Sequence, residues 1–219
     1  MSGTYDSTRL HPSQWRTEPF PHAVIDGLWD DDLLEAARRE FFYISPSQWR
    51  TYGDPEEYGK RAIDDSALWG SAVRTFFNIA GDPLFRADLE VMTGISDIDP
   101  HEAGGGLHET GENGRLGMHR DFNYNPLDGR PRRLNLLTYL NHDWDCAWGG
   151  CLYLGADRSI TVTPIFNRTV LFECGPESWH GHPDPIVGEH LRRSLATYYY
   201  TPPGSVDLGD GHSTIYRRD

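Results

Sequence analysis

The triplet His119-Arg120-Asp121 is the sharpest chemical feature of the sequence, because it lies in a strand-like run over residues 116–122. Alternate residues of a strand point to the same face, so His119 and Asp121 would converge while Arg120 faces the other way. An imidazole nitrogen beside a carboxylate oxygen offers two metal ligands. The triplet alone is a weak signal, since a surface histidine beside an acid gives the same pattern.

A second histidine downstream strengthens the metal interpretation. His180 lies 61 residues after His119, in the segment SWHGHPDP, which leaves room for several strands to bring it back to the same place. Two histidines and one carboxylate form the facial triad associated with non-haem Fe(II), which leaves open positions on the metal. His182 is a rival for the same role, and residue alternation does not choose between the two.

An arginine pair opens an aromatic strand near the end of the chain. A buried arginine needs an anionic partner, because an unpaired charge in the interior is costly, and its planar fork suits a carboxylate. Alternation lets only one of Arg192 and Arg193 point inward, and Ser194, Ala196 and Tyr198 would share the face of Arg192. A surface arginine paired with an exposed acid is the simpler alternative.

The elements that must position these residues change in character near residue 100. Before it, apolar spacing and caps predict helices, with Asp30 or Asp31 as the first cap and Pro83 opening the last helix; they cover about 31–41, 66–79 and 83–92. After it, short apolar runs between turn signals predict strands at 116–122, 133–141, 151–155, 159–165, 168–174 and 193–201.

Helices followed by many strands predict an α+β, mainly β fold, with N-terminal helices packed on one side of a β-sandwich or barrel. We expect residues 1–17 to be irregular. The stretches 45–63 and 104–114 look like long loops, which in compact domains tend to be functional and could form lids.

Charge and apolar content narrow the classes of partner. The formal net charge of −13, from 20 Lys and Arg against 33 Asp and Glu, argues against nucleic acid, because phosphate contacts need clustered cations. It equally disfavours an anionic membrane surface. No stretch approaches the ~20 apolar residues of a membrane span, and the N-terminus shows no apolar signal segment. We therefore expect a cytoplasmic protein, and the sequence names no protein partner.

The cysteines Cys146, Cys151 and Cys174 are scattered and odd in number. This pattern predicts no framework of disulfides and favours a reducing compartment.

Taken together and in order, these motifs resemble the Fe(II)- and 2-oxoglutarate-dependent oxygenases, particularly the prolyl-4-hydroxylase-like branch. The resemblance covers roughly residues 18–202 and is carried by His119-Arg120-Asp121, Tyr139-Leu140-Asn141, Trp144, Gly149-Gly150, His180 and Arg192-Arg193-Ser194. It implies a double-stranded β-helix (jelly-roll) core. The expected organisation is a single oxygenase domain over 18–219, helical over about 18–100 and jelly-roll over about 101–202.

The resemblance also implies roles for individual residues. His119, Asp121 and His180 would be the catalytic residues that bind Fe(II), and the H-G segment favours His180 over His182. Arg192 and Tyr139 would bind the distal carboxylate of the co-substrate 2-oxoglutarate. O2 is the second co-substrate, with ascorbate as a candidate reductant.

The implied reaction is hydroxylation of an unactivated C–H bond with release of succinate and CO2. Asp121 favours hydroxylation, since the resembling halogenases commonly lack this carboxylate. We expect a small-molecule, amino-acid-derived or natural-product substrate. The alternatives are a peptidyl (prolyl-type) hydroxylase, a zinc-dependent hydrolase, since zinc also takes two histidines and a carboxylate, and a non-catalytic jelly-roll binding module. Candidate residues of the substrate pocket are Asn123, Tyr124, Trp179, His182, His108 and Glu109.

Overall fold

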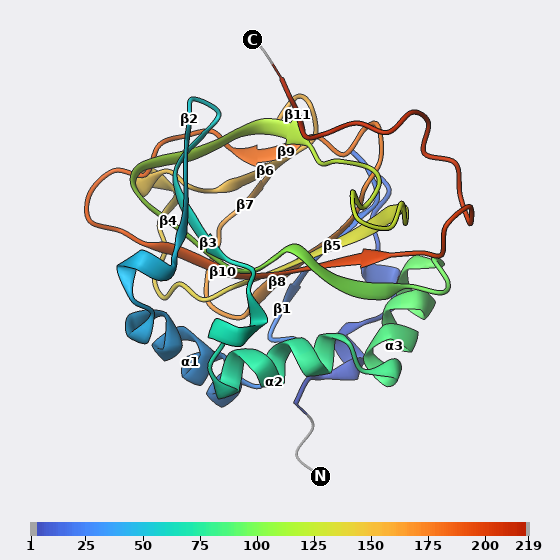
Figure 1. The fold of residues 1–219 in the computed structure, drawn as a ribbon, viewed down its shortest axis with the longest axis horizontal. Coiled ribbons are helices and arrows are strands. Elements are labelled where there is room, and N and C mark those ends of the chain that lie inside the picture. The colour runs from blue at the N-terminus through green and yellow to red at the C-terminus, as the bar shows by residue number, and fades with distance from the viewer. Residues whose placement is uncertain (1–3, 218–219) are drawn as a thin grey trace.

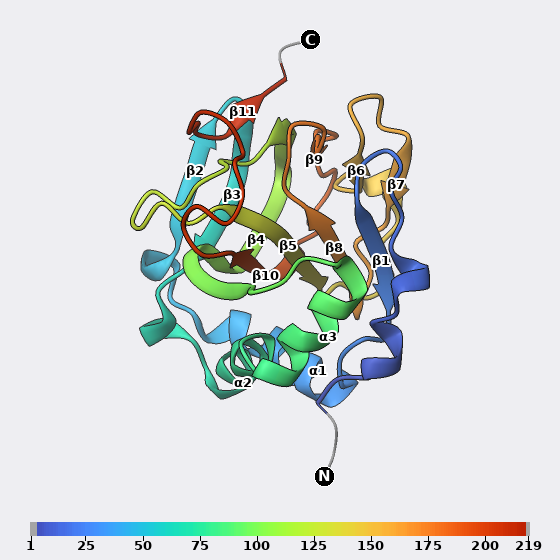
Figure 2. The same ribbon diagram turned by 90° about the vertical axis from the view of Figure 1, so that its right-hand side faces the viewer.

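The computed structural model describes residues 4–217, and Figure 1 shows their helices lying beneath one side of the strands. The described strands form one antiparallel sheet, which curls over so that its two ends face each other (Figure 2). The helices are α1 (Asp31–Glu40), α2 (Ser71–Ala80) and α3 (Pro83–Thr93). The strands are β1 (His22–Asp26), β2 (Arg50–Asp54), β3 (Glu57–Ile63), β4 (Asp99–Arg120), β5 (Arg132–Tyr139), β6 (Leu152–Leu154), β7 (Ile160–Val162), β8 (Arg168–Glu173), β9 (His180–His182), β10 (Arg192–Tyr200) and β11 (Ile215–Tyr216).

Strand β4 joins the two layers of the fold, a larger layer that contains β1, β8, β5 and β10 and a smaller layer that contains β9, β6 and β7. Its first half pairs with β10, where Thr110 lies opposite Arg192, and its last residues pair with β9, where His119 lies opposite His180. The backbone takes a positive φ at Gly106 and Asn113, +105° and +61°, which lets the strand change direction. The expected mainly β jelly roll with supporting N-terminal helices is confirmed.

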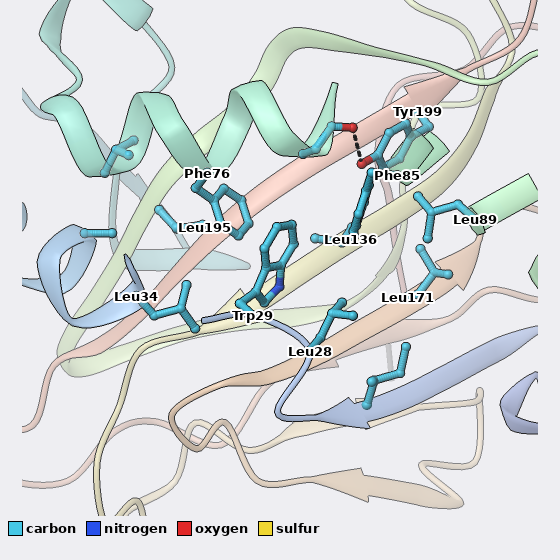
Figure 3. Close-up of a cluster of buried hydrophobic side chains, with 14 of the residues drawn as sticks. Leu28, Trp29, Leu34, Phe76, Phe85, Leu89, Leu136, Leu171, Leu195 and Tyr199 are labelled. Carbon is cyan, nitrogen blue, oxygen red and sulfur yellow. Dashed lines mark hydrogen bonds between the residues drawn. The ribbon is translucent and has the colours of Figure 1, made fainter. Parts of the chain in front are cut away.

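The helices pack on the outer face of the larger layer, as Figure 3 shows. Trp29 and Phe76 lie 4.3 Å apart between ring centroids. Tyr199 of β10 donates a hydrogen bond to the Ala80 carbonyl at the end of α2, at 2.9 Å. Because side chains alternate along a strand, the neighbours of these outward residues on β5 and β10 point into the interior between the layers.

Two expected loops are strands instead. Residues 50–63 form the β2–β3 hairpin, and β3 pairs with β4 over the stretch 107–116. Gly59, with φ +67°, lies at a register shift in β3. The sequence does not predict this hairpin, because its glycines and Pro55 are typical of loops and because β4, the strand that stabilises it, is distant in sequence.

The predicted helices are present, and one of them is divided. Asp30 caps α1 by accepting from the Leu33 amide, and Pro83 opens α3 as expected. The helix predicted at 66–79 is divided into a 3-10 turn, Ser66–Leu68, and α2. The cause is Glu40, whose carboxylate accepts from two amides of the first turn of α2 and sets its start. Of the stretch 1–17, which we expect to be irregular, residues 1–3 lie outside the described residues, and the rest contains two 3-10 turns, Ser7–Arg9 and Pro12–Gln14.

The structure pairs Cys146 with Cys151 in a disulfide, which corrects the expectation of no bridge. A 3-10 turn, Cys146–Trp148, is followed by Gly149 and Gly150 with positive φ, and this reversal brings the two Cα atoms to 5.5 Å. Cys174 is a buried free thiol. None of the helices in the described range is long and apolar enough to cross a bilayer.

Candidate active site

A cluster of two histidines and one aspartate lies between the layers. His119 and His180 face each other across β4 and β9, and Asp121 follows the end of β4. The Nε2 atoms of His119 and His180 lie 3.6 Å and 3.5 Å from the carboxylate oxygens of Asp121. One ligand atom from each of the three residues lies within 4.8 Å of the others, so the group could hold a metal ion.

The orientation of both histidines suits metal binding through Nε2. The Nδ1 atom of His119 lies 2.8 Å from the Gly117 carbonyl, and that of His180 lies 2.8 Å from the Ser178 carbonyl. An N–H on Nδ1 donates to each carbonyl, which leaves Nε2 with a free lone pair. Burial, together with the field of His119, lowers the pKa of His180 to about 4. His180 is therefore neutral near pH 7, the form in which imidazole is a ligand.

Two residues that sequence reasoning missed hold the Asp121 carboxylate. Asn135 donates to Asp121 Oδ2 at 2.6 Å, and the same oxygen lies 3.1 Å from Nη2 of the buried Arg132. Burial opposes ionisation of Asp121, yet Arg132 and the two histidines hold its pKa well below the usual value. The carboxylate is therefore ionised at neutral pH. Strand alternation could have found Asn135, which shares a face with Tyr139.

Arg192 points inward and Arg193 outward. Alternation predicted that only one of the two would point inward, and the family resemblance selected Arg192. Arg192 donates from Nε to the Gly150 carbonyl at 2.7 Å and from Nη2 to the Tyr139 hydroxyl at 3.1 Å. Burial lowers its pKa. None of the carboxylates in the described part of the chain forms an ion pair with Arg192, whereas Arg193 pairs with Glu109 at 2.7 Å on the opposite face. Arg192 is thus a buried cation that lacks an anion.

The cluster and Arg192 line one cavity of about 240 Å³. The β2–β3 hairpin contributes Tyr52, Glu57 and Lys60 to its wall, and β11 contributes Tyr216. Lys60 pairs with Glu57 at 2.7 Å. The hairpin from the stretch expected to be a lid therefore does border the cavity, although as strands.

The predicted substrate-pocket residues do not all meet there. His108 and His182 line the cavity. Asn123 instead binds the backbone of Leu208, Asp210 and His212, and the Tyr124 hydroxyl accepts from the Leu208 amide, so both hold the C-terminal segment. Asn123 and Tyr124 are not among the residues that line the cavity.

The other two candidates also lie elsewhere. Glu109 is on the face of β4 that points to the helices, where Arg61 and Arg193 bind it. The guanidinium of Arg120 lies over the Trp179 ring, and its central carbon is 4.9 Å from the ring centroid. Successive residues of a strand face opposite ways, so Glu109 points outward because its neighbours His108 and Thr110 point inward.

His182 was the rival to His180, and the structure separates their positions. His182 lies opposite Leu116 in the β4–β9 pairing and is outside the group whose ligand atoms converge. It is buried, and burial followed by the field of Arg192 lowers its pKa well below the usual value.

Residues 105–201 match the family described as the 2OG-Fe(II) oxygenase superfamily. This part of the chain, which is similar to that superfamily, contains His119, Asp121, His180 and Arg192. The predicted enzyme class, a 2-oxoglutarate-dependent dioxygenase, is confirmed by this match, and Fe(II) and 2-oxoglutarate are the cofactor and co-substrate of the class. No curated protein sequence matches the chain.

Solved oxygenases share the fold. A prolyl hydroxylase from Trichoplax adhaerens, solved with a peptide fragment of hypoxia inducible factor, has a TM-score of 0.62 at 17% identity, covering 82% of this chain and 83% of that one. A Pseudomonas putida prolyl-4-hydroxylase has a TM-score of 0.62 at 19% identity, covering 83% and 92%. HygX from Streptomyces hygroscopicus, solved with nickel, 2-oxoglutarate and hygromycin B, has a TM-score of 0.56 at 15% identity, covering 85% and 84%. The expected prolyl-hydroxylase-like branch is thus supported at the level of fold.

Proposed function

We propose that the protein is a hydroxylase that uses Fe(II) and 2-oxoglutarate to oxidise a C–H bond of a small substrate. The observation that carries this proposal is the presence, in one cavity, of a His–Asp–His cluster and a buried arginine with no carboxylate partner among the described residues. A buried unpaired charge is costly, so the cavity favours an anionic ligand beside a metal.

His119, Asp121 and His180 are the Fe(II) ligands in this proposal. Their donor set, two neutral imidazoles and one ionised carboxylate, is the set associated with non-haem Fe(II). When bound, the metal would supply the site at which O2 and 2-oxoglutarate react. Asn135 and Arg132 keep the Asp121 carboxylate ionised and fix its direction.

Arg192 and Tyr139 bind the distal carboxylate of 2-oxoglutarate. A guanidinium matches a carboxylate in shape and charge, and the Tyr139 hydroxyl adds a hydrogen-bonding group without adding charge. Burial raises the pKa of Tyr139, so its proton is retained near neutral pH. Gly150 holds the guanidinium through its carbonyl, which keeps it directed into the cavity.

A small-molecule or amino-acid-derived substrate fits the remaining space better than a large one. The cavity of about 240 Å³ is below the range of roughly 300–1,000 Å³ common for drug-sized ligands. Part of that space is needed for 2-oxoglutarate itself. A peptide that inserts a single side chain, as in prolyl hydroxylation, is the alternative.

The test is succinate formation from 2-oxoglutarate with Fe(II), stimulated by members of a panel of free amino acids, proline-containing peptides and small natural-product precursors. Asp121→Ala and Arg192→Met should each abolish stimulated succinate formation. Arg120→Met is the matched control, since Arg120 neighbours the same ligands yet binds the Pro176 carbonyl instead. Full activity in Asp121→Ala would refute the metal assignment.

Metal content separates this function from a zinc hydrolase. Protein purified without chelators and reconstituted anaerobically should bind one Fe(II), and 2-oxoglutarate should then give a visible charge-transfer absorbance that zinc cannot give. His180→Ala should lose metal binding and His182→Ala should keep it. The reverse result would exchange the roles of the two histidines.

A further inference from the structure

His182 has a buried side chain whose Nδ1 atom has no hydrogen-bonding partner in the described part of the chain. It is 4% exposed, and its Nδ1 atom is enclosed and makes no hydrogen bond within the described chain. Buried polar groups are nearly always hydrogen-bonded, and one that is not calls for an explanation. The other buried histidines of this region contrast with it, since the Nδ1 atoms of His119 and His180 both lie against carbonyls.

His182 lies in the wall of the cavity. It is two residues after His180 on β9, so both side chains point to the same side of that strand. It lines the cavity with Arg192, Lys60 and the metal-ligand candidates. In the strand register, His182 lies opposite Leu116, which also pairs with Glu57 of β3. Farther along β4, Thr110 lies opposite both Lys60 and Arg192. The register therefore places His182 on the side of the cavity towards Lys60 and Arg192.

A purely structural role explains this residue poorly. A leucine or valine at position 182 would fill the same space opposite Leu116 without burying an unpaired nitrogen. A metal-ligand role is also disfavoured, because His182 is outside the converging group.

We propose that the His182 ring donates a hydrogen bond to the distal carboxylate of bound 2-oxoglutarate, next to Arg192. This inference rests on the proposed function of the cavity. Because Nδ1 is enclosed, the N–H that reaches the ligand is the one on Nε2, and an imidazole N–H is a donor that suits a carboxylate. His182 is then a residue that positions and selects the co-substrate.

The test is anaerobic titration of the Fe(II)-loaded protein with 2-oxoglutarate, followed by charge-transfer absorbance and by calorimetry, in wild type, His182→Val and His182→Gln. His182→Val should weaken the Kd about tenfold or more, the loss expected for a hydrogen bond to a charged group. His182→Gln, which keeps an N–H donor, should recover part of that loss. Fe(II) affinity measured without 2-oxoglutarate should stay within about twofold in both variants.

A truncated ligand locates the contact. 2-Oxobutanoate keeps the 2-oxo acid that reaches the metal but lacks the distal carboxylate. Wild type and His182→Val should bind it equally. Equal weakening of 2-oxobutanoate and 2-oxoglutarate would overturn the proposal by placing His182 at the metal end.

Three other results are distinguishable. An unchanged 2-oxoglutarate Kd in His182→Val would refute the hydrogen bond. Loss of Fe(II) binding in that variant would make His182 a metal ligand instead. Failure of wild-type protein to bind 2-oxoglutarate at all, with Fe(II) bound, would refute the proposed function rather than the role of this residue.

Discussion

Arg132 Nη2 lies 3.1 Å from Asp121 Oδ2, so the carboxylate at the centre of the His–Asp–His cluster is paired with a guanidinium that is 1% exposed. The guanidinium also stacks on Tyr198, 3.6 Å from the ring centroid. Loss of one partner of a buried pair leaves an uncompensated charge, which is far more costly than loss of a surface pair.

Arg132→Met should therefore destabilise the metal-free protein by about 3 kcal/mol, measured as the free energy of unfolding in denaturant. Arg133→Met is the matched control, because the neighbouring arginine pairs with Glu173 nearer the surface, where such pairs contribute about 0–1 kcal/mol. Equal effects of the two substitutions would show that the Arg132–Asp121 pair adds no special stability.

The number of reactive thiols tests the cysteine pairing. Native protein should show no fast-reacting thiol, because Cys146 and Cys151 are bonded to each other and Cys174 is buried. Denaturant without reductant should expose one thiol, and reductant should raise the number to three. Three thiols in denaturant alone would mean that the disulfide is absent.

Alkaline pH should weaken the fold through Cys174. Burial raises the pKa of its thiol to about 12, from the ordinary value of 9.0 that it has in the unfolded chain. A raised folded pKa means that the folded state keeps its proton, so the contribution is full below pH 9 and is lost as pH rises towards 12. Between pH 8 and pH 10, wild type should lose about 1.4 kcal/mol of unfolding free energy relative to Cys174→Ala. Parallel pH profiles would contradict this.

Gly150→Ala should impair 2-oxoglutarate binding. Gly150 has φ +67°, and an added Cβ would lie 3.3 Å from Arg192 Cδ and 3.0 Å from the Trp144 ring. Residue 150, whose carbonyl accepts a hydrogen bond from Arg192, would move and displace the guanidinium. The Kd for 2-oxoglutarate in anaerobic titration should therefore rise about tenfold or more. Gly175→Ala is the control, because an added Cβ there meets nothing within 4 Å. An unaltered Kd in Gly150→Ala would show that Arg192 tolerates the crowding.

Residue alternation was enough to predict the parts of the site that lie along single strands. His119 and Asp121 converge as expected from a period of two, and Arg192 shares the cavity with Tyr198, as residues of one strand face should. Alternation allowed only one of Arg192 and Arg193 to point inward, and the family resemblance was needed to select Arg192. The jelly roll followed from the number of short apolar runs and the family resemblance.

The remaining features depend on pairings between distant segments. Arg132 reaches Asp121 at a register shift between Tyr199 and Tyr200, which no local pattern reveals. Strand β9 has three residues, too few to show a period. Strand β4 is rich in glycine, a residue typical of turns, so the sequence pattern does not predict a single strand of 22 residues. Asn123 binds the backbone of 208–212, more than eighty residues away in sequence, a contact that no local pattern predicts.

The short strand β11 has a practical consequence for anyone who produces this protein. Ile215 and Tyr216 pair with Arg120 and His119, and the Tyr216 ring lies 5.6 Å from that of His119. Near the other end of the described chain, the Tyr5 hydroxyl donates a hydrogen bond to Asp88 of α3. Helix α3 lies beneath the sheet (Figure 2). A purification tag or fluorescent fusion on the C-terminal side would be attached beyond a strand that pairs with His119, so the N-terminal side is the safer place for it.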